Sequence, residues 1–447
     1  MKNYIVCKFG GTSVGDAECI TRCADIVLSD PLHKVVLVSA TSGTTNDLVQ
    51  ICQDFSQSVA IVTKLKEKHY QIASDLSCSR DVFYAIDTLI NELHTLALGI
   101  SYLHDCSSRT KDRILSIGER LSSLLLSYVI QQRDRLCKNF DIRNVMMTDS
   151  NHCSAKPQID EIKNKVNDLM YPLLNEDYII VSQGFIGSNA KGVTTTLGRG
   201  GSDLSAALMA QALQAKELKI YTDVAGMKTT DPRIVENVLS INELSFDEAA
   251  ELATFGAKIL HPSTLIPAIQ CDIPVYLASS FEPDTLGTYI KSHVDQKPIV
   301  RAIALKQDQY LLTIKNPRML EACGFLASVF EVFSNFKISV DLITTSEISI
   351  AVSIDKDIKE NEEFIKELAK FGQIDFEENL SIIALVGNNI THTKGIAQKL
   401  FLNLTNHNIR MLCMGASSHN VCFLVDSSNS KEVVKILHKE FLEEAEQ

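Results

Sequence analysis

The sequence predicts an α/β protein in two parts: a large N-terminal domain with a mostly parallel sheet, and a C-terminal pair of small α+β repeats. Two observations support this fold class. Between residues 1 and 290, short apolar runs alternate with long helical stretches, which is typical of a parallel sheet covered by helices on both faces. Between residues 311 and 426, one pattern of strands and helices occurs twice, at a constant offset of 71 residues.

The N-terminal domain contains several strand-like runs. They are Tyr4–Lys8, Val35–Ser39, Tyr178–Gln183, Leu218–Tyr221 and Val275–Leu277. Residues 53–140 have a helical pattern and few turn-forming residues, so we expect them to be almost wholly helical. The polar stretch Lys291–Pro298 is the best candidate for a linker to the second part.

The second part consists of two copies of a βαββα pattern. The identical residues of the two copies are Gly324 and Gly395, Asn335 and Asn406, Ile338 and Ile409, Ser346 and Ser417, and Asp355 and Asp426. Each copy begins with a strand (311–315 or 382–387) and an amphipathic helix. Two alternating strands follow, at 338–342 and 348–354 in the first copy, and then a second helix (358–371 or 431–441). This order predicts a ferredoxin-like fold.

Composition excludes several classes of function. The 447 residues are 45% hydrophobic, and 43 basic against 55 acidic side chains give a net charge of −12. A binder of nucleic acid or of anionic membranes needs a basic surface, so neither partner is expected. No run reaches the roughly 18 apolar residues that span a bilayer. With no signal peptide before Lys8 and 12 scattered cysteines, we expect a cytoplasmic protein without a dedicated metal site.

Polar loops follow the predicted strands, where ligands of open α/β sheets bind. After the first strand, Lys8 is followed by Gly10 and Gly11, which allow a tight turn and bring backbone amides close to an anion. The chain has no Walker A motif, and a Gly-Gly turn alone is a weak signal. After the second strand, a loop that includes Ser39 and Thr45 offers hydroxyl groups to a polar substrate, or simply caps a helix.

The segment Thr194–Asp203 is the most informative one. It places Arg199 among three glycines, directly before a helical run that starts at Leu204. Arginine binds a carboxylate through two parallel hydrogen bonds, and a helix amino terminus adds anion-binding amides. Asp203 is favourable at a helix start for structural reasons alone. Its combination with Arg199 and the glycines nevertheless indicates a function.

Later segments add weaker candidates. Thr222 and Asp223 follow the fourth strand, and Asp231 and Arg233 lie in a further turn, so this region suits a nucleotide or consists simply of two turns. Glu119 lies in a helical region and, considered alone, would be a solvent-exposed helix residue. Together, the cationic groups, backbone amides and carboxylates predict phosphoryl transfer, which depends on positioning and electrostatic stabilisation.

These motifs, in the same order, resemble those of aspartokinases. The resemblance rests on Lys8–Val14, Thr194–Asp203, Thr222–Asp223, Thr229–Arg233 and Phe255–Pro262. The C-terminal repeat resembles the paired ACT regulatory domains of that family, and the likeness extends from residue 2 to about residue 440. The run Asp341–Glu347 is most similar to the monofunctional, lysine-sensitive class.

The resemblance implies an amino acid kinase fold, which is a carbamate kinase-like αβα sandwich, over residues 1–290. ACT-like repeats would occupy residues 299–380 and 381–447. The implied reaction is Mg²⁺-dependent transfer of the γ-phosphoryl group of ATP to the β-carboxylate of L-aspartate. The product, 4-phospho-L-aspartate, starts the route to lysine, threonine and methionine. The acceptor carboxylate is already a nucleophile, so no strong base is needed, and Mg²⁺ would be held mainly by the phosphates.

The resemblance also implies roles for the candidate residues. Lys8 would stabilise the transferring phosphoryl group, and Asp203 would orient Lys8. The aspartate side would be lined by Ser39, Thr45, Glu119, which takes the α-ammonium, and Arg199, which takes the α-carboxylate. ATP would contact Lys8, Gly10, Gly11, Thr222, Asp223, Lys228, Asp231, Arg233 and Lys258. Relatives often have Pro-Gly and then Tyr where this chain has Ala225 to Lys228, so we expect the nucleotide contact there to differ.

L-Lysine is the implied allosteric inhibitor, and the repeats place its site in the first copy. Asp341 and Glu347 correspond to Leu412 and Ser418 of the second copy, so only the first copy keeps carboxylates for a cationic amino acid. The candidate contacts are Met319, Gly324, Phe325, Leu326, Ser339, Val340, Asp341, Thr345, Ser346 and Glu347. The second copy would be a scaffold and dimer contact, giving a homodimer or a tetramer built from it.

Several alternatives stay open on the sequence alone. A catalytically inactive amino-acid sensor would be expected to lose the charged site residues that this chain keeps. Other enzymes with an amino acid kinase fold phosphorylate glutamate, acetylglutamate, carbamate or UMP. A fused homoserine dehydrogenase is disfavoured, because no GxGxxG motif follows a strand. Threonine could replace lysine as the effector, since the choice depends on a few side chains.

Overall fold

The computed structural model describes residues 4–256, 264–295, 298–319, 323–355 and 361–443. These residues form two compact units. The first comprises the described residues of 1–227, 242–246 and 260–293, and the second comprises those of 228–241, 247–259 and 294–447. The chain therefore passes between the units several times before residue 294.

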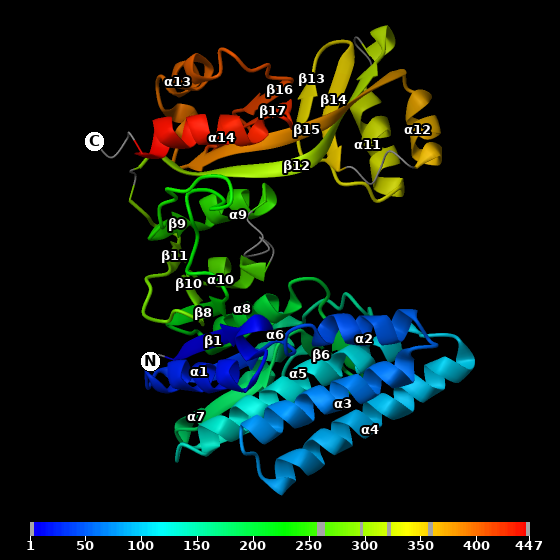
Figure 1. Ribbon diagram of the computed structural model, residues 1–447. Helices are drawn as coiled ribbons and strands as arrows, with labels where there is room; N and C mark the ends of the chain where they lie inside the picture. The colour runs from blue at the N-terminus through cyan, green and yellow to red at the C-terminus, as the bar shows by residue number, and fades with distance from the viewer. Residues whose placement is uncertain (1–3, 257–263, 296–297, 320–322, 356–360, 444–447) are drawn as a thin grey trace. The chain divides into compact units, whose positions relative to one another are not determined.

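A mostly parallel sheet forms the centre of the first unit (Figure 1). In spatial order, its described strands are β3 (Cys137–Phe140), β5 (Ile179–Gln183), β2 (His33–Val38), β1 (Ile5–Phe9), β8 (Glu217–Thr222), β10 (Val275–Ser279), β11 (Thr288–Lys291) and β9 (Glu243–Ser245). Neighbours from β3 to β10 pair in parallel, whereas β11 pairs antiparallel with β10. Strand β1 is buried along its whole length, as expected for a strand covered on both faces.

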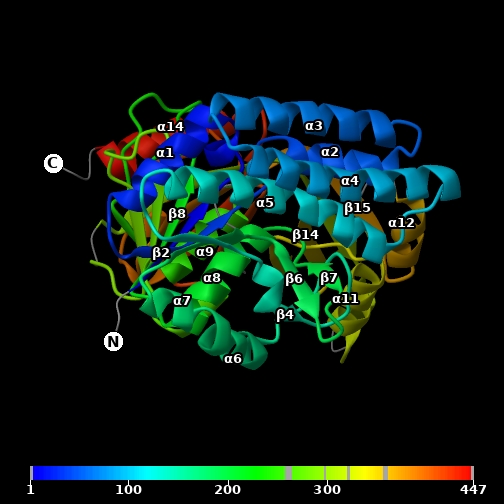
Figure 2. The ribbon, with the colours of Figure 1, turned by 90° about the horizontal axis from the view of Figure 1, so that it is seen from below.

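Helices cover both faces of this sheet (Figure 2). One face carries α1 (Ala17–Leu28), α2 (Thr44–Gln53), α3 (Ser58–Asp75), α4 (Arg80–Leu103) and α5 (Ser108–Gln131); the other carries α6 (Ile159–Leu169), α7 (Tyr171–Asn175), α8 (Gly201–Leu213) and α10 (Ile266–Gln270). Helix α5 contacts the sheet and also α1, α2 and α4, so most of its length is buried. A hydrophobic cluster joins β1 and β2 to α1–α5.

A small second sheet supports the loop that enters α8. Its strands are β4 (Met147–Thr148), β6 (Ile186–Asn189) and β7 (Thr194–Thr196). Strand β7 contacts α5, and residues 197–200 connect it directly to α8. The position of β7 therefore determines where the glycine-rich loop around Arg199 begins.

The second unit contains one antiparallel sheet shared by both repeats. In spatial order its described strands are β13 (Ile343–Thr345), β14 (Ser349–Asp355), β12 (Val300–Lys315), β15 (Gln373–Gly387), β17 (Asn420–Asp426) and β16 (Met411–Met414). The helices are α9 (Phe246–Thr254), α11 (Phe325–Asn335), α12 (Glu362–Ala369), α13 (Ile396–Asn403) and α14 (Ser430–His438). Gly324 and Gly395 cap α11 and α13 with φ of +83° and +85°, so the internal repeat is visible in the backbone.

The two long strands serve both repeats. Tyr310 and Leu312 of β12 pack in a hydrophobic cluster with α11 and α12 of the first repeat. Val300 and Ile303, earlier in the same strand, pack in the cluster of the second repeat with α13 and α14. The second repeat therefore takes a strand segment that precedes the first repeat in the chain. The domain boundaries drawn from the sequence stay predictions.

The predicted fold class is confirmed, with local differences. The strand expected at residues 338–342 is wrong. Ile338 and Val340 do pack against the core of the first repeat, which explains their alternation, but the ladder with β14 begins only at Ile343. Residues 137–140 form β3 rather than a helix, and the short strands β9, β11, β4, β6 and β7 were not expected. In the part of the chain described, no helix has the length and apolar character needed to cross a membrane.

Two helix glycines should respond oppositely to substitution. A Cβ at Gly118 in α5 would lie 2.6 Å from the Ala40 Cβ, whereas a Cβ at Gly99 in α4 meets nothing within 4 Å. Gly118→Ala should lower the free energy of unfolding by about 1–3 kcal/mol through overpacking. Gly99→Ala should raise it by about 0.5–1 kcal/mol, because alanine favours the helix. Urea unfolding monitored by circular dichroism checks both signs. Stabilisation by Gly118→Ala would contradict the close packing of α5 on the loop after β2.

Candidate active site

A pocket of about 310 Å³ opens at the carboxyl ends of the central strands of the first unit. It is lined by Lys8, Ser39, Thr45, Glu119, Phe185, Gly198, Arg199, Gly200, Gly201, Ser202 and Asp203. These residues come from β1, from the loop after β2 and the first turn of α2, from α5, from the loop after β5, and from the loop between β7 and α8 with the start of α8. The structure thus brings together the predicted catalytic and substrate-side residues, which are far apart in the sequence.

Lys8 and Asp203 form an ion pair inside this pocket. The Lys8 ammonium lies 2.7 Å from the Asp203 carboxylate, and both side chains are largely buried. Lys8 is fixed by the buried strand β1, and Asp203 lies in the first turn of α8, where the helix dipole favours a negative charge. The pair therefore holds a cation with a defined position next to the amino terminus of a helix.

Glu119 is buried in α5, not solvent-exposed as its sequence context alone suggested. One oxygen, Oε1, accepts a hydrogen bond of 3.2 Å from the Ala40 amide. The other, Oε2, is buried without a hydrogen-bond partner among the described residues. Burial raises the pKa of this carboxyl group to about 8, against the opposing effect of the Ala40 amide. The pocket therefore contains an acceptor that a ligand N–H group could satisfy.

Arg199 lies in a loop in which three neighbouring positions require glycine. Gly198 and Gly200 have φ of +80° and +72°, and a Cβ at Gly201 would lie 2.8 Å from the Phe185 ring. The Arg199 side chain is exposed and has no ion pair with any residue that the structure describes. A guanidinium group in this state is available to bind a carboxylate through two hydrogen bonds.

The loop after β2 is held from behind by helix α3. Lys68 donates hydrogen bonds to the Ser42 carbonyl (2.5 Å) and to the Thr44 hydroxyl (3.1 Å). The buried His69 ring contacts the Thr41 hydroxyl at 3.2 Å, and burial lowers the pKa of His69 to about 4, so the ring is neutral. Sequence reasoning missed these supports and also Phe185, because neither a motif nor spacing links them to the pocket.

The predicted nucleotide residues fall into two groups. Gly10, Gly11, Thr222 and Asp223 lie in the first unit at the ends of β1 and β8, where the Gly10 amide donates to the Tyr221 carbonyl (3.0 Å). A Cβ at Gly11 would lie 2.8 Å from the Ala40 carbonyl oxygen, so a glycine is required there.

The remaining nucleotide candidates, Lys228, Asp231 and Arg233, belong to the second unit. The Lys228 ammonium donates to the Ser240 hydroxyl (2.6 Å), and the Arg233 guanidinium is paired with Asp231 (2.6 Å). Lys258 lies outside the described residues.

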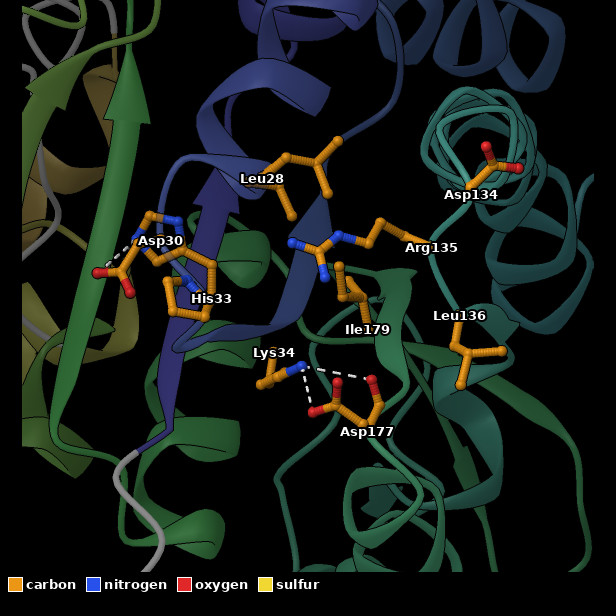
Figure 3. A pocket seen from close by; sticks show the side chains of 11 residues that line it. Leu28, Asp30, His33, Lys34, Asp134, Arg135, Leu136, Asp177 and Ile179 are labelled. Atoms are coloured by element: carbon orange, nitrogen blue, oxygen red, sulfur yellow. Dashed lines mark hydrogen bonds and ion pairs between the residues drawn. The ribbon is translucent and has the colours of Figure 1, made fainter.

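A second hollow lies at the opposite, amino-terminal ends of the strands (Figure 3). Lys34, at the start of β2, points toward Asp177 just before β5 and pairs with it at 2.8 Å. His33 is buried beside it and contacts the Ile26 carbonyl at 3.0 Å. In open α/β sheets ligands bind at the carboxyl ends of strands, so the pocket around Lys8 is the candidate active site.

The predicted effector residues lie in the first repeat of the second unit. Met319 ends a short 3₁₀ helix (Pro317–Met319), and Gly324, Phe325 and Leu326 form the start of α11. Ser339, Val340 and Asp341 precede β13, which ends at Thr345, while Ser346 and the exposed Glu347 form the turn into β14. The Asp341 carboxylate is paired with Lys306 of β12 at 2.5 Å.

Comparison with known proteins places the chain in a family. Residues 3–279 match the amino acid kinase family, and residues 383–441 match an ACT domain. The chain is 40% identical to lysine-sensitive aspartokinase 3 of Escherichia coli (strain K12), over 99% of this chain and 100% of that protein.

Two solved structures of E. coli aspartokinase III also match. Its complex with aspartate and ADP (R-state) has a TM-score of 0.86, and its complex with lysine and aspartate (T-state) has a TM-score of 0.85. Both are 41% identical and cover 98% of this chain and 99% of that chain. The chain therefore belongs to the aspartokinase family, as its motifs predicted.

The buried Glu119 should make folding stability depend on pH. Its pKa is raised from the ordinary 4.5 to about 8, so between these pH values the folded state binds more protons than the unfolded state. The stability that protonation of Glu119 contributes is fully present below pH 4.5. It is lost as the pH rises toward 8, and the free energy of unfolding falls by at most about 1.4 kcal/mol per pH unit. Glu119→Gln should therefore become progressively more stable than the wild type as the pH rises from 5 to 8.

Urea unfolding at several pH values measures this difference. Glu92→Gln is the matched control, because Glu92 pairs with Arg120 and Arg113, and its pKa is lowered. Its effect should be constant over the same pH range. A Glu119→Gln effect that does not change with pH would contradict a protonated, buried Glu119.

Proposed function

We propose that this member of the aspartokinase family transfers the γ-phosphoryl group of ATP to the β-carboxylate of L-aspartate in the pocket around Lys8. One observation carries the proposal: Arg199 and Glu119 line the same pocket as the Lys8–Asp203 pair, and among the described residues neither the Arg199 guanidinium nor Glu119 Oε2 has a partner. An α-amino acid presents a carboxylate and an ammonium, which these two groups complement. A phosphoryl acceptor would then lie beside a fixed cation.

Arg199 and Glu119 select the amino acid. The Arg199 guanidinium binds the α-carboxylate through two hydrogen bonds. The α-ammonium donates to Glu119 Oε2, and its positive charge compensates for the hydration that burial removes. This lowers the pKa of Glu119, so that the carboxyl group is ionised in the complex. Ser39 and Thr45 line the same pocket and offer hydroxyl groups to the remaining polar atoms. An amino acid whose α-carboxylate and α-ammonium are both held in this way directs its side-chain carboxylate to one place.

Lys8 stabilises the transferring phosphoryl group. Charge spreads over the equatorial oxygens during transfer, and a cation held in advance stabilises it without reorganisation. Asp203 orients the Lys8 ammonium through the 2.7 Å contact. The acceptor is an ionised carboxylate, so the pocket needs no general base.

The nucleotide lies at the ends of β1 and β8 in this proposal. Gly10, Gly11, Thr222 and Asp223 are its contacts there. The nucleotide roles that the resemblance implies for Lys228, Asp231 and Arg233 stay predictions. The described residues contain no group of three or more His, Cys, Asp or Glu side chains that could hold a metal. Mg²⁺ would be held mainly by the ATP phosphates, as the resemblance implies, and would neutralise their charge. The E. coli relative solved with aspartate and ADP supports this pair of substrates.

A coupled assay tests the reaction. With ATP, Mg²⁺ and L-aspartate, the protein should release ADP, and hydroxylamine should trap the acyl phosphate as a hydroxamate. Arg199→Ala should raise the KM for aspartate by about tenfold or more, because a charged hydrogen-bonded pair contributes about 1.5–3 kcal/mol. Arg135→Ala is the control, because Arg135 lines the hollow at the opposite end of the strands. If the wild-type protein forms no hydroxamate, the proposed reaction is wrong and the alternative of a catalytically inactive amino-acid sensor is favoured.

We further propose that L-lysine inhibits the enzyme by binding the first repeat near Asp341 and Glu347. Asp341 is the most enclosed of the effector candidates that carry a charge, and burial raises the pKa of its carboxyl group, while the Lys306 ammonium acts in the opposite direction. A lysine side chain in water offers the same ammonium group as Lys306. The ammonium of the effector therefore has to share Asp341 with Lys306 or to replace Lys306 as its partner. A homodimer through the ACT-like repeats is part of the proposal, and the lysine complex of the E. coli relative supports the choice of effector.

Two substitutions should shift lysine inhibition in opposite directions. Asp341→Asn should raise the inhibition constant by about tenfold or more, because a charged acceptor is lost. Lys306→Met should lower it by about threefold to tenfold, since it leaves Asp341 and Asp355 without their shared cation. Lys315→Met is the control, because Lys315 lies on the same strand and pairs with Asp375. Normal lysine inhibition of Asp341→Asn would overturn this site, and inhibition by threonine alone would change the effector.

A further inference from the structure

Asp112 is a buried carboxylate that the catalytic site does not use directly. It lies on α5, seven residues before Glu119, so the two side chains share one face of the helix. Its side chain is fully buried, and its two oxygens accept several short hydrogen bonds. The donors are His152 Nδ1 (2.6 Å), the Cys153 amide (3.1 and 3.2 Å) and the Thr196 hydroxyl (2.6 Å). A buried charge with this many donors indicates a position that the fold defines closely.

The first two donors fix a strained loop that touches the Arg199 loop. Cys153 has φ of +67°, a conformation that non-glycine residues rarely adopt, and its amide points at Asp112. The carbonyl oxygen of Cys153 lies so close to Gly198 that a Cβ there would be 3.2 Å from it. Gly198 directly precedes Arg199. The strained loop therefore forms one wall against which the Arg199 loop packs.

The third donor fixes the strand that leads into the same loop. Thr196 is the last residue of β7, and its hydroxyl donates to Asp112 while its carbonyl accepts from the Ala155 amide at 2.9 Å. The next residue, Leu197, donates its amide to the Phe185 carbonyl at 2.9 Å. The chain is thus held at Thr196 and Leu197, immediately before the glycines that flank Arg199.

We propose that Asp112 is a positioning residue for substrate binding: it holds both sides of the Arg199 loop and so sets the distance from Arg199 to Glu119. Because Asp112 and Glu119 share one helix, α5 fixes both ends of the amino acid site, Glu119 directly and Arg199 through Thr196 and Cys153. The inference rests on the proposed function, since it assigns Arg199 to the α-carboxylate. Asp112 itself touches neither the pocket nor the reacting atoms.

The hydrogen-bond pattern predicts which substitutions matter. Oδ1 of Asp112 accepts from the Thr196 hydroxyl and takes the shorter of the two hydrogen bonds from the Cys153 amide, while Oδ2 accepts from His152. Asparagine keeps one oxygen for Thr196 and Cys153, and its amide can donate to the other tautomer of His152. Alanine removes all of these contacts. Thr196→Val removes a single donor and keeps the shape of the side chain.

Steady-state kinetics of the full-length protein tests the proposal. The KM for aspartate should rise by about tenfold or more in Asp112→Ala and by about threefold to tenfold in Thr196→Val, because small misplacements of a binding group are costly. Asp112→Asn should stay within about threefold of the wild type. The KM for ATP should change little in all three. The variant that combines Asp112→Ala with Thr196→Val should have the same KM for aspartate as Asp112→Ala alone, since the Asp112 carboxylate and the Thr196 hydroxyl act through one hydrogen bond.

Asp87→Ala is the matched control. Asp87 also accepts a short hydrogen bond, from Tyr70 at 2.6 Å, and pairs with Lys66, but it lies on α4 outside the pocket. Its KM for aspartate should equal that of the wild type. If Asp112→Ala does not fold, Thr196→Val and Asp112→Asn decide the question.

An unchanged KM for aspartate in folded Thr196→Val, or an equal rise in the KM values for aspartate and ATP, would overturn the positioning role alone. Absence of aspartate-dependent hydroxamate in the wild type would instead overturn the proposed function, and this inference with it.

Discussion

The burial of Glu119 is the constraint on which the catalytic unit depends. A carboxyl group with one partnerless oxygen is costly to bury, by about 1–3 kcal/mol or more, unless something in the working protein satisfies it. Helix α5 is packed between the sheet and α1, α2 and α4, so the backbone that carries Glu119 is held in place. Gly118, next to Glu119, lets this helix approach Ala40 so closely that no larger residue fits. The fold therefore keeps an unsatisfied acceptor at a fixed place, which suits it to recognise an ammonium group.

The sequence predicted some parts of this site and could not predict others. Lys8 lies at the end of β1 directly before two glycines, and Arg199 lies in a glycine-rich loop after β7, so both positions leave a visible pattern in the sequence. Glu119 and Asp112 lie in a 24-residue helix that is buried on several sides, and helical periodicity alone does not reveal which polar residues of such a helix point inward. His69 and Lys68 support the site from a different helix, and only the packing of α3 shows it. Strands β1, β2, β5, β8 and β10 of the sheet were predictable because each is a compact apolar run. Strands β3, β9 and β11 were not, since they are short and partly polar.

The internal repeat shows how two similar folds acquire different chemistry. Both copies begin their first helix with a glycine at positive φ, so the loop before the helix has the same shape in each. Their side chains differ where charge matters, since Asp341 of the first copy faces Lys306 while Leu412 occupies the corresponding place in the second. The Lys306–Asp341 pair is only partly buried, and separating such a pair costs less than breaking a fully buried one. The asymmetry of the copies therefore comes from a few substitutions on a common backbone.

Shared elements within the second unit connect the proposed effector site to the segment that contains Asp231 and Arg233. Strands β12 and β15 each belong to both repeats, so a change at Asp341 acts on a strand that continues into the second copy. That copy holds the segment with Asp231 and Arg233: Ile303 donates to the Thr229 carbonyl at 2.7 Å, and Thr229 contacts the buried His438 at 2.8 Å. Arg301 of β12 also pairs with Glu248 of α9 at 2.9 Å. An allosteric inhibitor needs only to favour one arrangement of such a connected unit. Because the proposed effector site and the segment with Asp231 and Arg233 belong to one compact unit, a change at one of them can act on the other without a separate relay.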